Sequence, residues 1–303
     1  MQPTRSPLVS PTQFLIGYQL QREWAWLIAA AFFFGTAGAG TYIVSFAVGF
    51  HVGIVASLVI IGVLKATAHM LFLGKPLRFP FAVLKWRTSW ISRGIVAMLV
   101  FLVSGLLYAA SFPAGSPVSS SVGHAFAWIA AVAAAVIMVY DGFVLRSSRG
   151  IPMWNTLLFP AVGLSYSLLG GSTITLALQK LWNESTDRWL EWLQLGLTFV
   201  NVGLILAVIL TARSRDPATR ISVSLLTRGP IAPFFVGLAV GVGVVATLVL
   251  IVVSLAGGGT WALVAAGVTD LVGEFFLFFS LLRVGAHPSP RPISVGFATA
   301  GAR

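Results

Sequence analysis

Long apolar runs alternate with short polar segments along the whole chain. Each run is about 20 residues long, the length that an α-helix needs to cross the hydrocarbon core of a bilayer. Charged residues, prolines, glycine clusters and tryptophans mark the ends of the runs, as they do at membrane interfaces. The pattern predicts eight transmembrane helices, at about 24–50, 54–73, 89–111, 124–145, 154–179, 189–211, 231–255 and 261–284.

The composition agrees with a membrane protein. Of 303 residues, 57% are hydrophobic and 9% are charged, which is more apolar surface than one soluble core could bury. A net charge of +11 would suggest nucleic-acid binding in a soluble protein. Here the charges lie between the apolar runs, so we attribute them to membrane topology and expect lipid, not nucleic acid, around the chain. The first 23 residues lack a continuous apolar core before a cleavage site, and we expect an interfacial segment there, not a secretory signal peptide.

The basic residues are unevenly distributed between the two sides of the membrane. Eight crossings put both termini on one side, together with the loops around 74–88, 146–153 and 212–230. That side holds 16 of the 19 lysines and arginines. By the positive-inside rule, both termini are predicted to be cytoplasmic.

A weak internal repeat divides the chain into two halves. Trp128 precedes Asp141 by 13 residues, as Trp261 precedes Glu274. A unit with an even number of helices keeps both copies in the same orientation, so the repeat would be parallel. We therefore predict two four-helix bundles, although chance matching in an apolar sequence is the alternative. The predicted segments are an N-terminal segment 1–23, a first bundle 24–145, a linker 146–153, a second bundle 154–284 and a tail 285–303.

Four of the charged residues inside the predicted helices are candidates for a position at membrane depth. They are Lys65, Asp141, Asp270 and Glu274. A charge in hydrocarbon costs several kcal/mol unless it is neutralised, paired or hydrated, so these side chains should face the interior of a bundle. One interpretation is a proton path. The other is structural, with Lys65 as the partner of Asp141 or Glu274.

The residues that commonly bind metals are few. There is no cysteine, which excludes iron–sulfur clusters held by this chain, thiolate-bound zinc and covalent c-type haem. Only His51 and His124 share a membrane depth, and both lie at helix ends, so we expect no haem. His69 shares a helix face with Lys65 at i+4 and suits a quinone carbonyl or a proton path.

Two segments resemble a known family. Leu73-Gly74-Lys75-Pro76-Leu77-Arg78-Phe79, followed by Ser89-Trp90-Ile91-Ser92-Arg93-Gly94, resembles the signature loop of the NrfD, or polysulfide reductase membrane-subunit, family, and Tyr140-Asp141-Gly142-Phe143 looks similar too. Lys75 replaces the family's usual arginine, which keeps the charge but loses the bidentate geometry. Asp141 stands where a small hydroxyl residue is expected and adds a titratable group.

The resemblance implies an eight-helix, quinone-reactive subunit in a bacterial cytoplasmic (inner) membrane. It would bind exchangeable menaquinone or ubiquinone and dock an iron–sulfur electron-transfer subunit, which serves a molybdopterin-type catalytic subunit of a respiratory oxidoreductase. Tyr140 would bind the quinone, with His69 and Asp141 beside it and with Trp90 and Arg93 at the mouth. The residues expected at the partner interface are Lys75, Arg78, Lys85 and Arg87.

Other interpretations remain open at this point. Trp90 could be an interfacial anchor, and the cations from Arg78 to Arg87 a cluster that binds lipid headgroups. The whole chain could be a proton-coupled transporter or ion-translocating subunit that uses its intramembrane charges, although no helix has a convincing central proline break. A passive anchor is the third alternative.

Overall fold

Helices dominate the described structure. The computed structural model describes residues 18–74, 79–113, 120–182 and 188–288. Each of the eight expected spans is present within four residues of its predicted ends, which confirms an all-α polytopic membrane protein. The spans are Trp26–Ala47, His51–Leu73, Trp90–Ala110, Ser120–Ser147, Leu158–Leu181, Arg188–Ser214, Pro233–Leu255 and Thr260–Arg283.

Two of the spans change their helix type along their length. The second consists of α2 (His51–Val59), a π-helical segment η2 (Ile60–Lys65) and α3 (Ala66–Leu73), and the seventh of the π-helical η5 (Pro233–Ala246) and α10 (Thr247–Leu255). The remaining elements are β1 (Gln19–Leu20), α1 (Trp26–Ala47), α4 (Phe79–Ala82), the 3-10 helix η4 (Val83–Lys85), α5 (Trp90–Ala110), α6 (Ser120–Ser147), α7 (Leu158–Leu181), α8 (Arg188–Ser214), α9 (Pro217–Thr227), α11 (Thr260–Arg283) and β2 (Ala286–His287).

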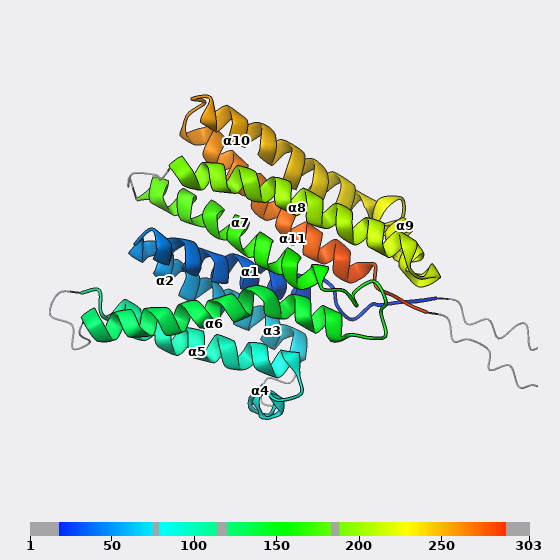
Figure 1. Ribbon diagram of the computed structural model, residues 1–303, viewed down its shortest axis with the longest axis horizontal. Coiled ribbons are helices and arrows are strands. Elements are labelled where there is room, and N and C mark those ends of the chain that lie inside the picture. Colours follow the sequence, from blue (N-terminus) through cyan, green and yellow to red (C-terminus); the bar gives the residue numbers. More distant parts are fainter. Residues whose placement is uncertain (1–17, 75–78, 114–119, 183–187, 289–303) are drawn as a thin grey trace, which may run out of the picture.

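The spans lie side by side along the long axis of the molecule (Figure 1). α1 and α7 are the most buried spans, whereas α8 and the η5–α10 span are the most exposed. α1 contacts α2, η2, α3 and α6 on one side and α7 and α11 on the other. α4 and α9 lie at the end of the bundle where the described chain begins and finishes (Figure 1). The centre of the molecule is therefore the α1–α7 pair, and α1 contacts two spans of the first half of the chain and two of the second half.

The backbones of α1 and α7 approach each other very closely. A Cβ atom on Gly40 would overlap the carbonyl group of Ser167, and one on Gly171 would overlap the backbone of Gly40. Further along, the Ser45 and Thr175 hydroxyls lie 3.0 Å apart. Small residues permit this approach, which increases the dispersion contacts that hold membrane helices together.

The two ends of the described chain meet in a short antiparallel pair, β1 with β2. The Gln21 amide donates to the Gly285 carbonyl at 2.8 Å, which extends the pairing by one hydrogen bond. The loop between α6 and α7 packs against this region, since the Trp154 ring stacks on Trp24 at 5.3 Å and its indole N–H donates to the Leu281 carbonyl at 3.1 Å. Most of the expected interfacial segment 1–23 lies outside the described residues.

Candidate functional site

A small cavity opens between α1, α3, α5 and α6. Its volume is about 150 Å³, similar to the roughly 150 Å³ apolar cavity that is known to hold a benzene ring. Most of the lining is aliphatic or aromatic, and three side chains bring polar atoms to it. The lining residues are Trp24, Ile28, Phe32, His69, Phe72, Leu73, Ile91, Tyr140, Asp141 and Val144.

α6 contributes Tyr140 and Asp141 to the cavity. Both side chains are almost fully buried. The Tyr140 ring packs directly on Gly94 of α5, where a Cβ would overlap the ring. The glycine therefore sets how deeply the ring sits between α5 and α6. Asp141 Oδ1 has no hydrogen-bond partner among the described residues, which is costly for a buried carboxyl oxygen unless a ligand or water meets it.

Lys65 pairs with Asp141 behind the cavity. The two side chains are 0% and 2% exposed, and Lys65 Nζ lies 3.2 Å from Asp141 Oδ2. The ammonium also donates to the Ala31 carbonyl at 2.7 Å and lies 4.9 Å from the centre of the Tyr140 ring. Gly35 of α1 makes room for the ammonium, because a Cβ there would overlap Nζ. Of the two partners considered for Lys65, the structure places it against Asp141.

His69 reaches the cavity from α3. Its Nδ1 lies 3.1 Å from the Lys65 carbonyl, one helical turn earlier. Because a carbonyl oxygen only accepts hydrogen bonds, we assign the proton to Nδ1 in the neutral ring, which leaves Nε2 as an acceptor. With Tyr140 and Asp141, His69 forms the polar part of the cavity wall.

Trp90 and Arg93 lie at the start of α5 and do not line this cavity. Trp90 stacks on Phe143 at 4.2 Å, and the Arg93 guanidinium lies 4.5 Å from the Trp90 ring. Arg93 also donates to the Trp86 carbonyl at 3.1 Å and the Arg87 carbonyl at 2.8 Å. The structure therefore brings Tyr140, Asp141 and His69 together, while Trp90 and Arg93 are not among the residues that line the cavity.

The expected partner-docking residues are only partly visible. Lys85 and Arg87 are exposed on the segment that precedes α5. The Arg87 guanidinium lies 5.4 Å from the Trp86 ring. Lys75 and Arg78 lie outside the described residues.

A second group of buried polar side chains lies between α1, α7, α8 and α11. The Thr36 hydroxyl donates to Glu274 Oε1 at 2.7 Å, while Oε2 has no partner among the described residues. One turn earlier on α11, Asp270 Oδ2 accepts from the Thr173 hydroxyl at 2.6 Å. Gln194 of α8 donates to the same hydroxyl at 2.7 Å. Glu274 and Asp270 thus share one face of α11 but not the cavity.

Sequence reasoning missed the polar partners of these acids. Thr36, Thr173 and Gln194 are fully or almost fully buried. A signal was present for Gln194, because an amide in an apolar run is as rare as an acid and needs a partner. Threonines carry no comparable signal, since they satisfy themselves by bonding to the preceding turn of their own helix.

The described part of the interior has no cluster of side chains suited to a metal ion. Among the residues that the structure describes, no three His, Asp or Glu side chains gather closely enough to hold one. The polar groups of the cavity are hydrogen-bond donors and acceptors that also titrate. An apolar cavity with a few polar groups in its wall has the character of an organic-ligand site.

The fold and the site define a class of protein. It is a multi-pass helical membrane protein with a small, mostly apolar cavity and titratable side chains in the cavity wall. The comparisons narrow this class: residues 16–287 match the family model described as "Polysulphide reductase, NrfD". The chain belongs to this family. No curated protein matches it. Membership indicates a membrane subunit of a polysulphide-reductase-like complex, and the resemblance seen in the loop motifs extends over nearly the whole chain.

Proposed function

We propose that this chain is the quinone-binding membrane subunit of a multi-subunit respiratory oxidoreductase. It would exchange electrons between menaquinone or ubiquinone and an iron–sulfur partner subunit. The observation that carries the proposal is the cavity beside Tyr140, Asp141 and His69, which has room for one ring and few polar groups. Family membership adds the expectation of a quinone-reactive subunit.

The cavity residues suit the edges of a quinone ring. A bound quinone supplies two-electron redox chemistry that also takes up or releases two protons. Tyr140 can donate a hydrogen bond to a ring oxygen, and His69 Nε2 can accept one from a ring hydroxyl. Asp141, with Oδ1 unpaired, is placed to take or return a proton. The aromatic walls formed by Trp24 and Phe32 would pack against the faces of the ring.

Lys65 supports Asp141 from the side away from the ligand. Its ammonium satisfies Oδ2, so Oδ1, which has no partner among the described residues, is the oxygen left for proton exchange. The carbonyl of Ala31 and the ring of Tyr140 hold the ammonium in place. Lys65 is thus a positioning residue, and it places a compensating positive charge beside a carboxylate in a region without bulk water.

We also propose a proton route through the second half of the chain. Glu274 and Asp270 are almost fully buried, and Glu274 Oε2 lacks a partner among the described residues. Buried polar atoms of this kind are commonly met by ordered water. The Thr173 hydroxyl and the Gln194 amide lie on one side of Asp270. Together with ordered water, they would connect the two acids to the membrane surface at which α8 begins.

The proposed partners are an iron–sulfur subunit and a molybdopterin-type catalytic subunit in a bacterial cytoplasmic membrane. Lys75, Arg78, Lys85 and Arg87 form the basic segment between the second and third spans. A basic segment on the side with both termini suits the cytoplasmic face and an acidic partner surface.

The test is quinol-dependent turnover of the chain purified with the subunits that accompany it. Tyr140→Phe removes one hydrogen bond and should lower kcat/KM about tenfold. Asp141→Asn removes the proton acceptor and should lower kcat about a hundredfold. The matched control is Tyr108→Phe, the same change on a buried tyrosine near the other end of α5.

Binding of a labelled quinone to the purified chain separates a lost site from misfolding. We expect Asp141→Asn to bind quinone but to turn over slowly. If Tyr140→Phe and Asp141→Asn both keep the turnover of the unmodified complex, the cavity is not the quinone site. A chain that moves a solute in liposomes and shows no quinol turnover would contradict the proposed function itself.

A further inference from the structure

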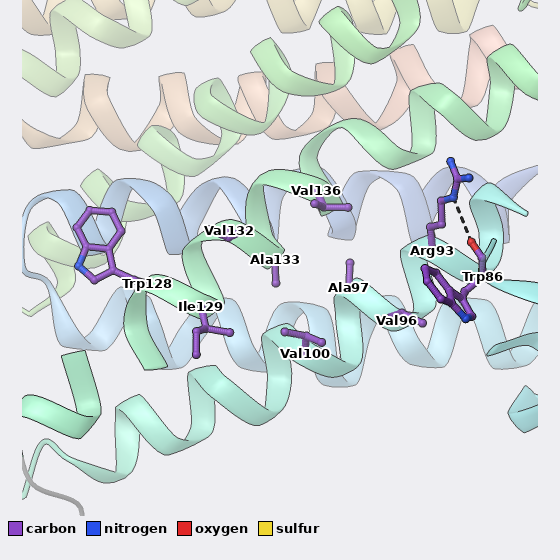
Figure 2. Close-up of a pocket in the computed structure, with 10 residues that line it drawn as sticks. All are labelled: Trp86, Arg93, Val96, Ala97, Val100, Trp128, Ile129, Val132, Ala133 and Val136. Atoms are coloured by element: carbon purple, nitrogen blue, oxygen red, sulfur yellow. Dashed lines mark hydrogen bonds between the residues drawn. The ribbon is translucent and has the colours of Figure 1, made fainter. Parts of the chain in front are cut away.

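A long groove runs along the outer face of the seam between α5 and α6. Its volume is about 530 Å³, within the roughly 300–1,000 Å³ that is typical of ligand sites. Figure 2 shows Val100 and Ala97 of α5 facing Ile129 and Ala133 of α6 along it. This groove is distinct from the cavity at Tyr140 and shares no lining residue with it.

Small side chains hollow the floor of the groove. Ala97 and Ala133 are buried at the helix–helix seam, whereas Val132 and Val100 project from its rims and are exposed. Two alanines opposite each other leave the space that larger residues would fill. The lining in Figure 2 is aliphatic between its two ends, so a hydrocarbon chain matches it along its length.

Tryptophans close both ends of the groove. Trp128 is 65% exposed and Trp86 is 53% exposed, so each end of the groove presents an amphipathic ring to the surroundings of the protein. Gly94 packs on Tyr140, so the Arg93 end of the groove lies near residue 140 of α6. Twelve residues separate that level from Trp128, which is about 18 Å of helix. The groove therefore extends past one leaflet of about 15 Å of hydrocarbon.

Positive charge is fixed at one end only. The Arg93 guanidinium is held by the carbonyls of Trp86 and Arg87, and it lies over the Trp90 ring. These bonds use two of its five N–H groups, and no other acceptor is found among the described residues. Arg87 adds a second guanidinium over Trp86, whose ring lines the groove.

Neither Arg93 nor Arg87 forms an ion pair with a carboxylate of the described residues. The sequence contains no Asp or Glu between residues 24 and 140. In the part of the chain that the structure describes, the one ion pair is Lys65 with Asp141 in the interior. The end of the groove is thus a preorganised cationic site without an internal anion.

We propose that the groove binds an anionic phospholipid. One acyl chain lies along the α5–α6 seam, and the phosphate accepts hydrogen bonds from Arg93 beside the charge of Arg87. A guanidinium binds a phosphate through two parallel hydrogen bonds. Three features favour a lipid as the occupant: the aliphatic lining, the tryptophan at each end and the charge that no described carboxylate pairs with. The transmembrane helix of a partner would not need a fixed cation at this depth.

The test is titration of the purified complex with phosphatidylglycerol or phosphatidylcholine, with bound lipids counted by native mass spectrometry. We expect phosphatidylglycerol to bind more tightly. Arg93→Gln should weaken its binding about tenfold, the loss of one charge-assisted contact, whereas Arg220→Gln on α9 should leave it unchanged. Arg87→Gln provides a second variant in case Arg93→Gln does not fold.

A substitution that fills the groove tests the binding of the acyl chain separately from the binding of the headgroup. Val132→Trp should lower the binding of both lipids, while Val249→Trp, on a comparably exposed site of α10, should not. The proposal is overturned if the two lipids bind alike and Arg93→Gln changes neither. It is also overturned if a photoreactive residue at position 100 captures a quinone or a protein in place of phospholipid.

Discussion

The Lys65–Asp141 pair shows how a single buried ion pair connects packing with chemistry. Each group alone would be a costly charge in the membrane interior. The Lys65 ammonium makes two hydrogen bonds, to Asp141 Oδ2 and to the Ala31 carbonyl, and Asp141 Oδ1 has no partner among the described residues. Gly35 is part of the arrangement, because it gives the ammonium its space.

Removing one partner of the Lys65–Asp141 pair should destabilise the protein more than replacing both partners with apolar residues. Lys65→Met leaves the carboxylate without its partner and should destabilise the protein by about 3–5 kcal/mol, whereas Lys65→Met combined with Asp141→Leu should recover most of that loss. Reversible unfolding in mixed micelles measures both. Lys180→Met, a lysine at a helix end, should change stability by less than about 0.5 kcal/mol. Equal losses in the single and double variants would contradict a coupled pair.

The polar residues at membrane depth were visible in the sequence because charge is rare there. Lys65, Asp141, Asp270 and Glu274 are all buried inside the bundle. Their partners were not predictable, since a helix can rotate about its axis to present Lys65 to either Asp141 or Glu274. Which acid pairs with Lys65 depends on how closely the helices approach one another, and no local sequence pattern encodes that approach. The assignment of their chemical roles remains a prediction.

Among the elements, α1 and α7 pack backbone against backbone. Gly40 and Gly171 bring the two backbones into direct contact, so the gain is dispersion energy spread over the length of both helices. Backbone cannot move aside as a flexible side chain does. Any added atom must therefore separate the helices.

Gly171→Ala should destabilise the protein by about 1–3 kcal/mol through overpacking. Gly196→Ala is the matched control on α8, where a Cβ would meet no atom within 4 Å. It should be neutral or stabilise the protein by up to about 1 kcal/mol, because alanine favours the helix more than glycine does. Thermal unfolding in detergent distinguishes them. A Gly171→Ala protein as stable as Gly196→Ala would show that the two backbones are farther apart than described.

The long elements were predictable and the short ones were not. Apolar length determines a membrane span, so every expected helix is present. α9 was taken as part of a loop, although Asp216 and Pro217 mark a helix start, with Asp216 capping the Ala218 amide at 2.7 Å. The β1–β2 pair and the π-helical segments depend on contacts far apart in sequence, and two-residue strands carry no pattern of their own.

At the scale of the whole molecule, the two halves contain different polar interiors. The first half has the cavity and the Lys65–Asp141 pair. The second has Glu274 and Asp270 with hydroxyl and amide partners. The division into two parallel four-helix units remains a prediction, but it would explain why each half buries an acid on its last helix. Under the proposed function, quinone binding and proton movement would reside in separate halves.

Glu274→Gln should therefore uncouple proton movement from electron transfer. Glutamine still accepts the hydrogen bond from Thr36 but cannot carry a proton. In liposomes containing the complex, we expect fewer protons moved per quinol while quinol turnover stays within about twofold of the unmodified rate. Asp216→Asn, at the cap of α9, is the control. An unchanged proton-to-electron ratio in Glu274→Gln would remove Glu274 from the route.

The pairing of β1 with β2 has a consequence for how the chain could be rearranged. Because residues 19–20 lie beside residues 286–287, the described chain is nearly a closed loop. A short linker between these strands would allow new ends in the segment 183–187, which joins α7 to α8. Such a circular permutant would begin with α8 and finish with α7, and it would keep every helix–helix contact while changing the order in which the spans enter the bilayer. We therefore expect insertion order and final architecture to be separable in this fold.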